Sequence, residues 1–579
     1  MQKKQTILVV ASLLVVVLSV TLAYFTAQII GEGKNISVSS ADLKIVFTDT
    51  DGNIEGSNIT PGWSNSKTFT VKNESNGTYK YDIIIKDLIN TFKTYKYLQY
   101  KITSTDGGYN MTDYSYLPKS STKEDVTLAY EVSIDKGKTH TYTIEIKYVN
   151  DEAVDQSIDM GQSLSGTIYI REFTKPIMKF TDKLMADNPL IKTRTTFKAF
   201  TETNTGTLYK ATEQIGTNES KDVYYFAGDA KNNWVKFGKT TESSCTYKGK
   251  EVIYVNRTNQ TIKTPQNETE CTSTNICDAG ENGYAVGLTE SECSGMDSTK
   301  WITEKATWNV TSTKDIYWRI IRTNADGSIK LLYAGTSPDT EKAYIGKSAF
   351  NSTDDDPMYA GYKYGTTGSL ENNRLNTNNS TIKTYVDNWY KNNLTAYTKY
   401  LSNDAVYCND RNLASGSTYS TTKPFNYASY ERIYTSIYLT NQPTYNCTNV
   451  SDAFSVNNTS AKLDYPVGLM TIDELNYAGG EFNTSLTAPY AWYYTNANGE
   501  SSYSDLEFWS LSPFEWYRSR LDEWKVLGSS DPGRLNGFGV SSMGAVRPSV
   551  SLSSCNLISR GDGSPENPYL VYTGSGVCE

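Results

Sequence analysis

A single histidine limits the acid–base chemistry that this chain can perform. His140 lies in an alternating stretch that predicts a strand on which His140, Tyr142 and Ile144 share one face. A zinc protease of the His-Glu-x-x-His type needs two histidines, and no motif here brings a nucleophile or a carboxylate to this one. We therefore expect His140 to be a partly exposed strand residue without a catalytic role, and we expect no enzyme activity.

Eight cysteines, all beyond residue 240, form the second group of chemically capable residues. An even number in an exported chain favours disulfides. Zinc is the alternative, but a zinc site needs close Cys-x-x-Cys pairs or histidine partners, and the chain has neither. We expect local disulfides, among them Cys555 with Cys578 and Cys408 with Cys447, and no metal or other cofactor. The cysteines are Cys245, Cys271, Cys277, Cys293, Cys408, Cys447, Cys555 and Cys578.

An aromatic and basic segment near the C-terminus supplies the candidate ligand-binding residues. Tryptophan, tyrosine and arginine are enriched at the energetic centres of protein interfaces. We expect a long loop from about 481 to 545 to form a contact surface around them. The alternative is that the tryptophans fill the core of their domain. The candidate residues are Trp516, Tyr517, Arg518, Arg520 and Trp524.

The first 25 residues predict export. Residues 6–25 carry no charge and follow Lys3 and Lys4, and an apolar helix of this length crosses a hydrocarbon core of roughly 30 Å with its N-terminus in the cytoplasm. Small residues before the Ala23–Tyr24 bond also suit a signal peptidase. Residues 1–25 are thus a signal peptide or a membrane anchor, and in both cases the rest of the chain faces outward.

The exported part is predicted to be mainly β. Residues 26–175 contain short alternating runs separated by turn signals, which fit six to eight strands of an antiparallel β-sandwich. This region has no cysteine, so burial of strand faces must stabilise it, with about 2 kcal/mol from each large aliphatic side chain. The predicted core residues are Val71, Ile83, Ile85, Ile144, Ile146 and Ile168.

A connector and a second domain follow. Residues 176–204 are expected to hold a helix over 176–189, bounded by two prolines, and a linker. Residues 205–579 are expected to form an α+β domain with a Cys-rich insertion at 239–315.

Within this second domain we expect four strands and two helices. Residues 223–226 should pair with 234–237, and 318–322 with 328–333 through a turn at Asp326–Gly327. The helices are predicted near 381–398 and after Thr471, where Glu474 completes a capping box and is therefore structural.

Four short segments lie in a recognisable order within roughly the first 170 residues: Thr21–Thr26, Ser40–Ile45, Ile59–Gly62 and Phe69–Asn73. In order and spacing they resemble the opening of the TasA/camelysin family of exported bacterial proteins. The resemblance implies a jelly-roll subunit of biofilm-matrix fibres. Camelysin is described as a surface metalloendopeptidase, but no catalytic residue carries over to this chain.

Three segments of the C-terminal part stand out together: Tyr465–Leu469, Phe508–Pro513 and Gly544–Val550. They resemble segments of uncharacterised modules of exported Firmicutes proteins, which look distantly like the C-type-lectin-like fold. The calcium and sugar triplets of the lectins are absent, so the resemblance implies the fold without calcium-dependent sugar binding.

These features favour a bacterial cell-surface protein that binds a host, matrix or envelope ligand, protein or glycan. A subunit of an extracellular fibre, formed by self-association, is the second interpretation, and a metalloendopeptidase-like surface hydrolase is the third. A net charge of −9 without a run of basic residues argues against nucleic acid as a partner.

Overall fold

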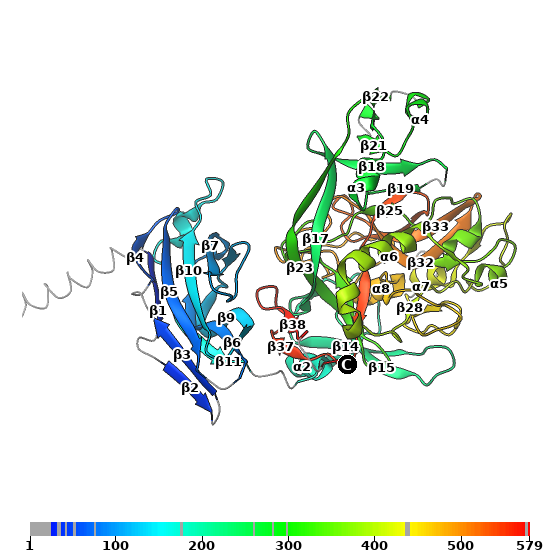
Figure 1. Ribbon diagram of the computed structural model, residues 1–579. Coiled ribbons are helices and arrows are strands. Elements are labelled where there is room, and N and C mark those ends of the chain that lie inside the picture. The colour runs from blue at the N-terminus through cyan, green and yellow to red at the C-terminus, as the bar shows by residue number, and fades with distance from the viewer. Residues whose placement is uncertain are drawn as a thin grey trace, which may run out of the picture. The chain divides into compact units, whose positions relative to one another are not determined.

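The chain divides into two compact units, residues 1–175 (unit 1) and residues 176–579 (unit 2). Figure 1 shows both in a computed structural model. The structure describes residues 25–31, 36–40, 43–49, 54–74, 77–173, 178–258, 261–280, 283–296, 299–434, 441–573 and 577–578.

The predicted leader lies almost entirely outside these ranges. Ala23 and Tyr24 are not described, and of residues 6–25 only Phe25 is, as the first residue of a strand. No helix in the described ranges combines the length and the apolar character that a membrane crossing requires.

Unit 1 consists of two β-sheets, as the alternating sequence predicts. The first sheet has the order β4-β1-β11-β6-β9 and the second β2-β3-β5-β10-β7-β8. The strands are β1 (Phe25–Gly31), β2 (Ile36–Ser40), β3 (Leu43–Asp49), β4 (Ile54–Ile59), β5 (Ser64–Asn73), β6 (Tyr79–Asn90), β7 (Leu98–Ser104), β8 (Ser115–Tyr116), β9 (Ser120–Ile134), β10 (Thr139–Tyr148) and β11 (Ser163–Glu172).

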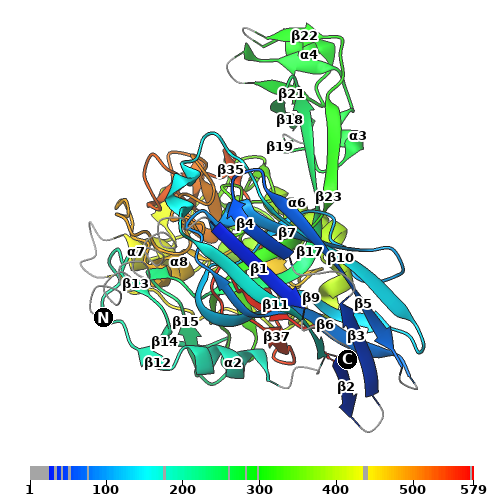
Figure 2. The same cartoon turned by 90° about the vertical axis from the view of Figure 1, so that its left-hand side faces the viewer.

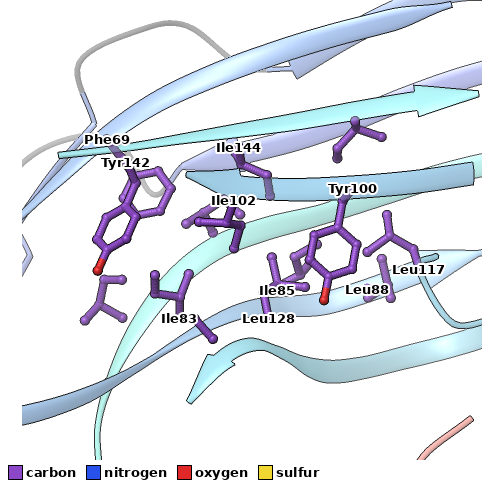
Figure 3. Close-up of a cluster of buried hydrophobic side chains, with 14 of the residues drawn as sticks. Phe69, Ile83, Ile85, Leu88, Tyr100, Ile102, Leu117, Leu128, Tyr142 and Ile144 are labelled. Carbon is purple, nitrogen blue, oxygen red and sulfur yellow. The ribbon is translucent and has the colours of Figure 1, made fainter. Parts of the chain in front are cut away.

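The two sheets enclose one hydrophobic core. Figure 3 shows Phe69, Ile102 and Tyr142 from one sheet and Ile83 and Ile85 from the other within this core. The predicted core residues Val71, Ile83, Ile85, Ile144, Ile146 and Ile168 are all fully buried.

The sandwich differs from the prediction in strand number and in one pairing. It has eleven described strands, and β1 runs parallel to β11 while it pairs antiparallel with β4. An entirely antiparallel sandwich was therefore the wrong expectation. The prediction assumed that neighbouring strands follow each other in the sequence and are joined by hairpins. Strand β1 lies instead between β4 and β11, so its direction is not set by a hairpin.

Unit 2 is also dominated by strands. They are β12 (Leu190–Lys192), β13 (Thr203–Asn204), β14 (Thr207–Glu213), β15 (Lys221–Tyr225), β16 (Asp229–Ala230), β17 (Trp234–Tyr247), β18 (Lys250–Asn256), β19 (Thr261–Lys263), β20 (Ile276–Asp278), β21 (Tyr284–Val286), β22 (Lys300–Ile302), β23 (Thr307–Thr323), β24 (Ile329–Tyr333), β25 (Lys347–Ala349), β26 (Lys363–Tyr364), β27 (Asn378–Asn379), β28 (Tyr407–Cys408), β29 (Phe425–Asn426), β30 (Ala453–Phe454), β31 (Val467–Gly468), β32 (Phe508–Tyr517), β33 (Arg520–Val526), β34 (Leu535–Gly539), β35 (Met543–Ala545), β36 (Ser549–Leu552), β37 (Ile558–Arg560) and β38 (Tyr569–Val571).

The α-helices of unit 2 are short. The helix after Ser380 covers Thr381–Asn393, and a 3₁₀ turn over Thr395–Tyr400 continues it, so the predicted single helix over 381–398 is divided. The described α-helices are α2 (Phe180–Asp187), α3 (Glu268–Cys271), α4 (Glu290–Ser294), α5 (Leu370–Asn373), α6 (Thr381–Asn393), α7 (Ala428–Ile433) and α8 (Ile472–Ala478).

The connector helix belongs to the packing of unit 2. Helix α2 is shorter than the predicted 176–189, and it buries Phe180 and Leu184. The Phe180 ring lies 5.2 Å from that of Tyr569 in β38, and the Tyr569 hydroxyl donates to Asp187 over 2.9 Å. The apolar stripe of the helix is therefore covered by the body of unit 2.

Strand β23 organises the main sheet of unit 2. The predicted hairpin across Asp326–Gly327 is confirmed as β23 and β24. The predicted pairing of 223–226 with 234–237 is wrong, because β15 and β17 both pair with β23, through Tyr225 and Trp234. Both segments have strand composition, but the sequence did not reveal β23 as their shared neighbour.

The predicted Cys-rich insertion is a lobe at the end of a two-stranded ribbon. Strands β17 and β23 pair from Trp234 to Thr246 and from Thr307 to Arg319. Figures 1 and 2 show the lobe, with β18, β21, β22, α3 and α4, beyond the rest of unit 2.

Candidate functional site

The predicted contact residues lie on a β-hairpin and not in a long loop. Strands β32 and β33 pair through Trp516–Leu521 and Tyr517–Arg520, so only Arg518 and Ser519 form the turn. The alternation of a strand separates the candidates. Trp516 and Trp524 are buried, whereas Tyr517, Arg518 and Arg520 are exposed.

The turn holds two non-glycine residues in the left-handed region. Arg518 and Ser519 have φ of 52° and 57°, the condition for a type I′ turn, which usually carries asparagine or glycine. The guanidinium of Arg518 lies 5.0 Å from the Tyr517 ring centroid, and Arg520 Nε donates to Asp522 over 2.7 Å. We call the exposed residues Tyr517, Arg518 and Arg520 the hairpin tip.

The two buried tryptophans anchor this hairpin. The indole Nε1 of Trp524 donates to Ser429 Oγ over 3.1 Å, and its ring lies 4.5 Å from that of Phe514. Gly537 on β34 permits this packing, because a Cβ there would lie 2.1 Å from the Phe514 ring. Of the sequence-based alternatives, core packing describes both tryptophans.

Acidic side chains lie behind the hairpin tip. Burial raises the pKa of Glu515 to about 7, and the neighbouring Asp522 adds to this effect. Burial also raises the pKa of Asp522, against the effect of Arg520. Glu523 is fully buried and neither carboxyl oxygen has a hydrogen-bond partner among the described residues, so its pKa lies well above 4.5. The charge next to the hairpin tip therefore changes near neutral pH.

All eight cysteines are paired in disulfides. The two predicted bonds, Cys408–Cys447 and Cys555–Cys578, are present, and Cys245–Cys271 and Cys277–Cys293 pin the lobe. The zinc alternative is thereby excluded for these cysteines, because a disulfide sulfur is not a thiolate ligand. Across the described ranges, no group of three or more His, Cys, Asp or Glu side chains is placed to hold a metal.

His140 is buried, contrary to the expectation of partial exposure. It is 5% exposed on β10, and its Nδ1 lies 2.9 Å from the Tyr81 hydroxyl, which lies 2.6 Å from that of Tyr142. Burial lowers the pKa of His140, although Asp106 acts in the opposite direction. The imidazole is therefore held by the tyrosine hydroxyls at the edge of the sandwich core.

An ionic cluster lies inside unit 2, around a small cavity. Arg322 binds Glu213 over 2.8 Å and Glu474 over 2.9 Å, and Lys330 binds Glu474 over 2.7 Å. Arg432 binds Asp473 and Asp410, each over 2.8 Å. The ionic cluster consists of Glu213, Arg322, Lys330, Asp410, Arg432, Asp473 and Glu474, which all line the cavity.

The cavity is too small for a substrate. Its volume is about 20 Å³, enough for one buried water. Burial raises the pKa of Glu474, but Lys330 and Arg322 outweigh burial and hold its pKa below 4.5. Glu474 also completes the predicted capping box, since it accepts from Thr471 N over 2.9 Å. The four acids of the ionic cluster are thus held by its three bases, and the cluster is structural.

Comparisons with known proteins do not identify a family for this chain. No family model matches it, and no curated protein matches it. A solved structure reported under "AvmM Catalyzes Macrocyclization in Alchivemycin A Biosynthesis" is 10% identical, covers 25% of this chain and all of its own, and has a TM-score of 0.14. A score this low carries no argument about fold or function. The resemblances to TasA/camelysin and to lectin-like modules remain predictions.

Sequence reasoning missed the acids behind the hairpin tip and most of the ionic cluster. Glu213, Arg322 and Glu474 are 109 to 152 residues apart in pairs that bond directly. No local spacing signals such a cluster. The capping box at Thr471 could be predicted from the sequence, but it indicated only that Glu474 caps a helix and not that Glu474 binds Arg322.

Proposed function

We propose that the protein acts outside the cytoplasmic membrane by binding a surface or matrix ligand, and that it carries out no reaction. Four disulfides support an oxidising location, which suits the export signal in residues 1–25. The observation that carries the proposal is the hairpin tip: an exposed tyrosine and two exposed arginines on a hairpin anchored by buried tryptophans.

The chemically capable groups elsewhere support binding more than turnover. The histidine is closed into a core, the cysteines are oxidised, and the ionic cluster pairs acids with bases around room for one water. A lectin-like fold for unit 2 and retention of the leader as an anchor are parts of the same proposal. Both fit a recognition module held at the cell surface.

A binding assay with two matched variants tests the hairpin tip. Beads coated with the full chain are offered immobilised mucin, an extracellular-matrix preparation and purified Gram-positive envelope. The test variant combines Tyr517→Ser and Arg518→Asn, and it keeps Arg520 because Arg520 neutralises the buried Asp522. Asparagine tolerates the left-handed conformation at position 518.

The control uses a second hairpin of the same kind. Lys248 and Gly249 join β17 to β18 with φ of 49° and 75°, and the Lys248 ammonium lies 5.1 Å from the Tyr247 ring. Lys248→Asn with Lys250→Ser removes exposed cations from that turn. We expect at least tenfold weaker binding to one probe for the Tyr517/Arg518 variant and unchanged binding for the control. Equal binding by both variants, or none to any probe, contradicts the proposal.

A fibre subunit is the second candidate function, and the place of β1 favours it. This strand begins at Phe25, the last residue of the apolar leader, and it lies within a sheet, between β4 and β11. If β1 pairs with the sheet of a neighbouring molecule, the chains link end to end. Sedimentation at increasing protein concentration tests this candidate. A chain that stays monomeric at high concentration contradicts it.

A further inference from the structure

Residues 105–110 form a loop against the buried side chain of Tyr142; we call them the end loop. They join β7 to β8, contain no helix or strand, and are mostly exposed. Figure 3 shows Tyr142 at one end of the labelled core residues. A Cβ at Gly108 would lie 2.5 Å from the Tyr142 hydroxyl, so glycine permits the close approach of the end loop to the core.

Two attachments hold the end loop on strand β10. In the first, Thr141 N donates to both carboxylate oxygens of Asp106, over 2.8 and 2.9 Å, and the Ser104 hydroxyl donates to the same carboxylate over 2.9 Å. In the second, Tyr109 N donates to the Tyr142 hydroxyl over 3.1 Å. The first attachment is exposed to solvent, whereas the second ends on a fully buried side chain.

A chain of hydrogen bonds continues from the second attachment to the single histidine. The Tyr142 hydroxyl lies 2.6 Å from that of Tyr81, which lies 2.9 Å from His140 Nδ1. All three side chains are at most 5% exposed. On the other side of the imidazole, a Cβ at Gly107 would lie 3.8 Å from Nε2. The end loop thus lies next to Nε2 directly and is joined to Nδ1 through two tyrosines.

The neutral imidazole satisfies this chain in one arrangement. When Nδ1 accepts from the Tyr81 hydroxyl, the Tyr81 oxygen accepts from the Tyr142 hydroxyl, and the Tyr142 oxygen accepts from Tyr109 N. Each hydroxyl then donates once and accepts once. On this ground we assign the proton of the neutral ring to Nε2.

A second proton on the imidazole reverses the chain. Both ring nitrogens of a charged histidine are donors, so Nδ1 must donate to the Tyr81 oxygen, and Tyr81 must donate to Tyr142. The hydrogen of the Tyr142 hydroxyl is then left without an acceptor among the described residues. A buried donor without a partner is unfavourable. If the end loop leaves, water can reach this hydroxyl and accept the hydrogen bond.

The charges around His140 allow this change in mildly acidic solution. Burial lowers the pKa of His140 below 6.5, against the two aspartates that face it. Burial raises the pKa of Asp106, but hydrogen bonds from Thr141 and Ser104 outweigh burial and hold it below 3.8. Between neutral pH and about pH 5, the imidazole therefore gains charge while Asp106 stays ionised. The titratable groups that face His140 are Asp106, Asp135, Tyr81 and Tyr142.

We propose that protonation of His140 releases the end loop, so that residues 105–110 form an acid-sensitive switch at one end of the sandwich. The closed loop requires the neutral imidazole, so a falling pH shifts the equilibrium towards the open loop. Tyr81 and Tyr142 act as positioning residues that transmit the change. The switch lies in unit 1, so it does not depend on the function proposed for the hairpin tip.

Hydrogen exchange and NMR of the full chain test the switch. Because His140 is the only histidine, ¹³C-labelled histidine gives one imidazole signal whose titration reports its charge. The exchange protection of residues 105–110 is followed by mass spectrometry from about pH 8 to about pH 4.5, corrected for the intrinsic pH dependence of exchange. Peptides from β11 report global unfolding. As His140 gains charge, we expect the protection of the end loop to fall about fivefold or more.

Four variants separate the parts of the chain. Tyr142→Phe removes the acceptor of Tyr109 N and keeps the ring, so the loop should be open at every pH. Tyr81→Phe interrupts the chain, so His140 should still titrate but the loop should no longer respond. His140→Gln cannot titrate, and its loop protection should not change in this pH range. The matched control is Tyr97→Phe, which removes a hydroxyl bonded to Asp151 and should respond as the wild type does.

The expected result is a loss of loop protection that follows the His140 titration in the wild type and in Tyr97→Phe alone. The proposal is overturned if His140 gains charge while the loop stays protected, if the histidine signal does not titrate in this range, or if β11 loses protection together with the loop. A pH response that persists in Tyr81→Phe would overturn the role of the tyrosines. The wild-type comparison needs no variant, so a variant that fails to fold leaves it decisive.

Discussion

Replacing Glu474 by glutamine should destabilise unit 2 strongly. The side chain is 1% exposed and joins the guanidinium of Arg322 and the ammonium of Lys330. Glutamine keeps the capping box, which accepts either residue at this position, so the substitution removes the charge alone. Breaking a buried ion pair by removing one partner costs about 3–5 kcal/mol.

Two features of the ionic cluster limit the loss of stability that Glu474→Gln causes. Glu213 remains on Arg322, so Lys330 is the cation left uncompensated. An exposed lysine has a pKa of 10.5, and burial lowers that of Lys330. Neutralising an exposed lysine at pH 7 costs about 5 kcal/mol, which is an upper limit on the penalty. We therefore expect about 3–5 kcal/mol, a large share of the stability of a typical domain.

Urea unfolding followed by tryptophan fluorescence is the assay, because nine of the ten tryptophans lie in unit 2 and urea does not screen charge. The matched control is Glu292→Gln, which changes the capping box of Thr289 in the lobe and leaves the ionic cluster intact. The pKa of Glu474 is lowered in the folded protein, so its contribution is present above about pH 4.5 and is lost as the pH falls through the folded pKa. Equal losses in both variants, or a difference that does not shrink in acid, would refute the reasoning.

The other predictions concern the histidine, the hairpin and the lobe. Burial lowers the pKa of His140, so the imidazole binds a proton more tightly in the unfolded chain than in the folded one. Unit 1 should therefore lose stability as the pH falls below 6.5. Calorimetry should find that this pH dependence of stability is absent in His140→Gln. Trp516→Ala should cost about 3–5 kcal/mol in urea unfolding, since the ring is 2% exposed, and a loss below 1 kcal/mol would contradict core packing. Removing the Cys277–Cys293 bond by two serines should admit protease between these positions while the fluorescence midpoint of the body stays within error; a body that unfolds with the lobe would show that they are one cooperative unit.

Patterns with a short range in sequence predicted the structure best. The alternation around Val71 and Ile144, the turn at Asp326–Gly327 and the capping box at Thr471 all depend on neighbouring residues. The two predicted disulfides join cysteines that are 39 and 23 residues apart and next to each other among the cysteines of the sequence. Each of these follows from a backbone or side-chain preference that tertiary packing did not override.

Features set by distant residues were not predictable in this way. The pairing of β15 and β17 depends on β23, about 90 residues further along the chain. The burial of His140 depends on Tyr81, which no spacing rule connects with it. In the hairpin tip, the residue types were identified but their exposure was not. Two-residue turns with positive φ are normally recognised in a sequence by glycine or asparagine, and this turn has Arg518 and Ser519 instead.

The distribution of cysteines separates the maturation of the two units. Every covalent cross-link lies in unit 2, and the sandwich of unit 1 has no cysteine at all. Unit 1 can reach its final state from the chain alone, whereas unit 2 needs a thiol oxidant. A cell deprived of its oxidase would thus hold a half-finished molecule: a complete N-terminal sandwich followed by a reduced, protease-sensitive remainder.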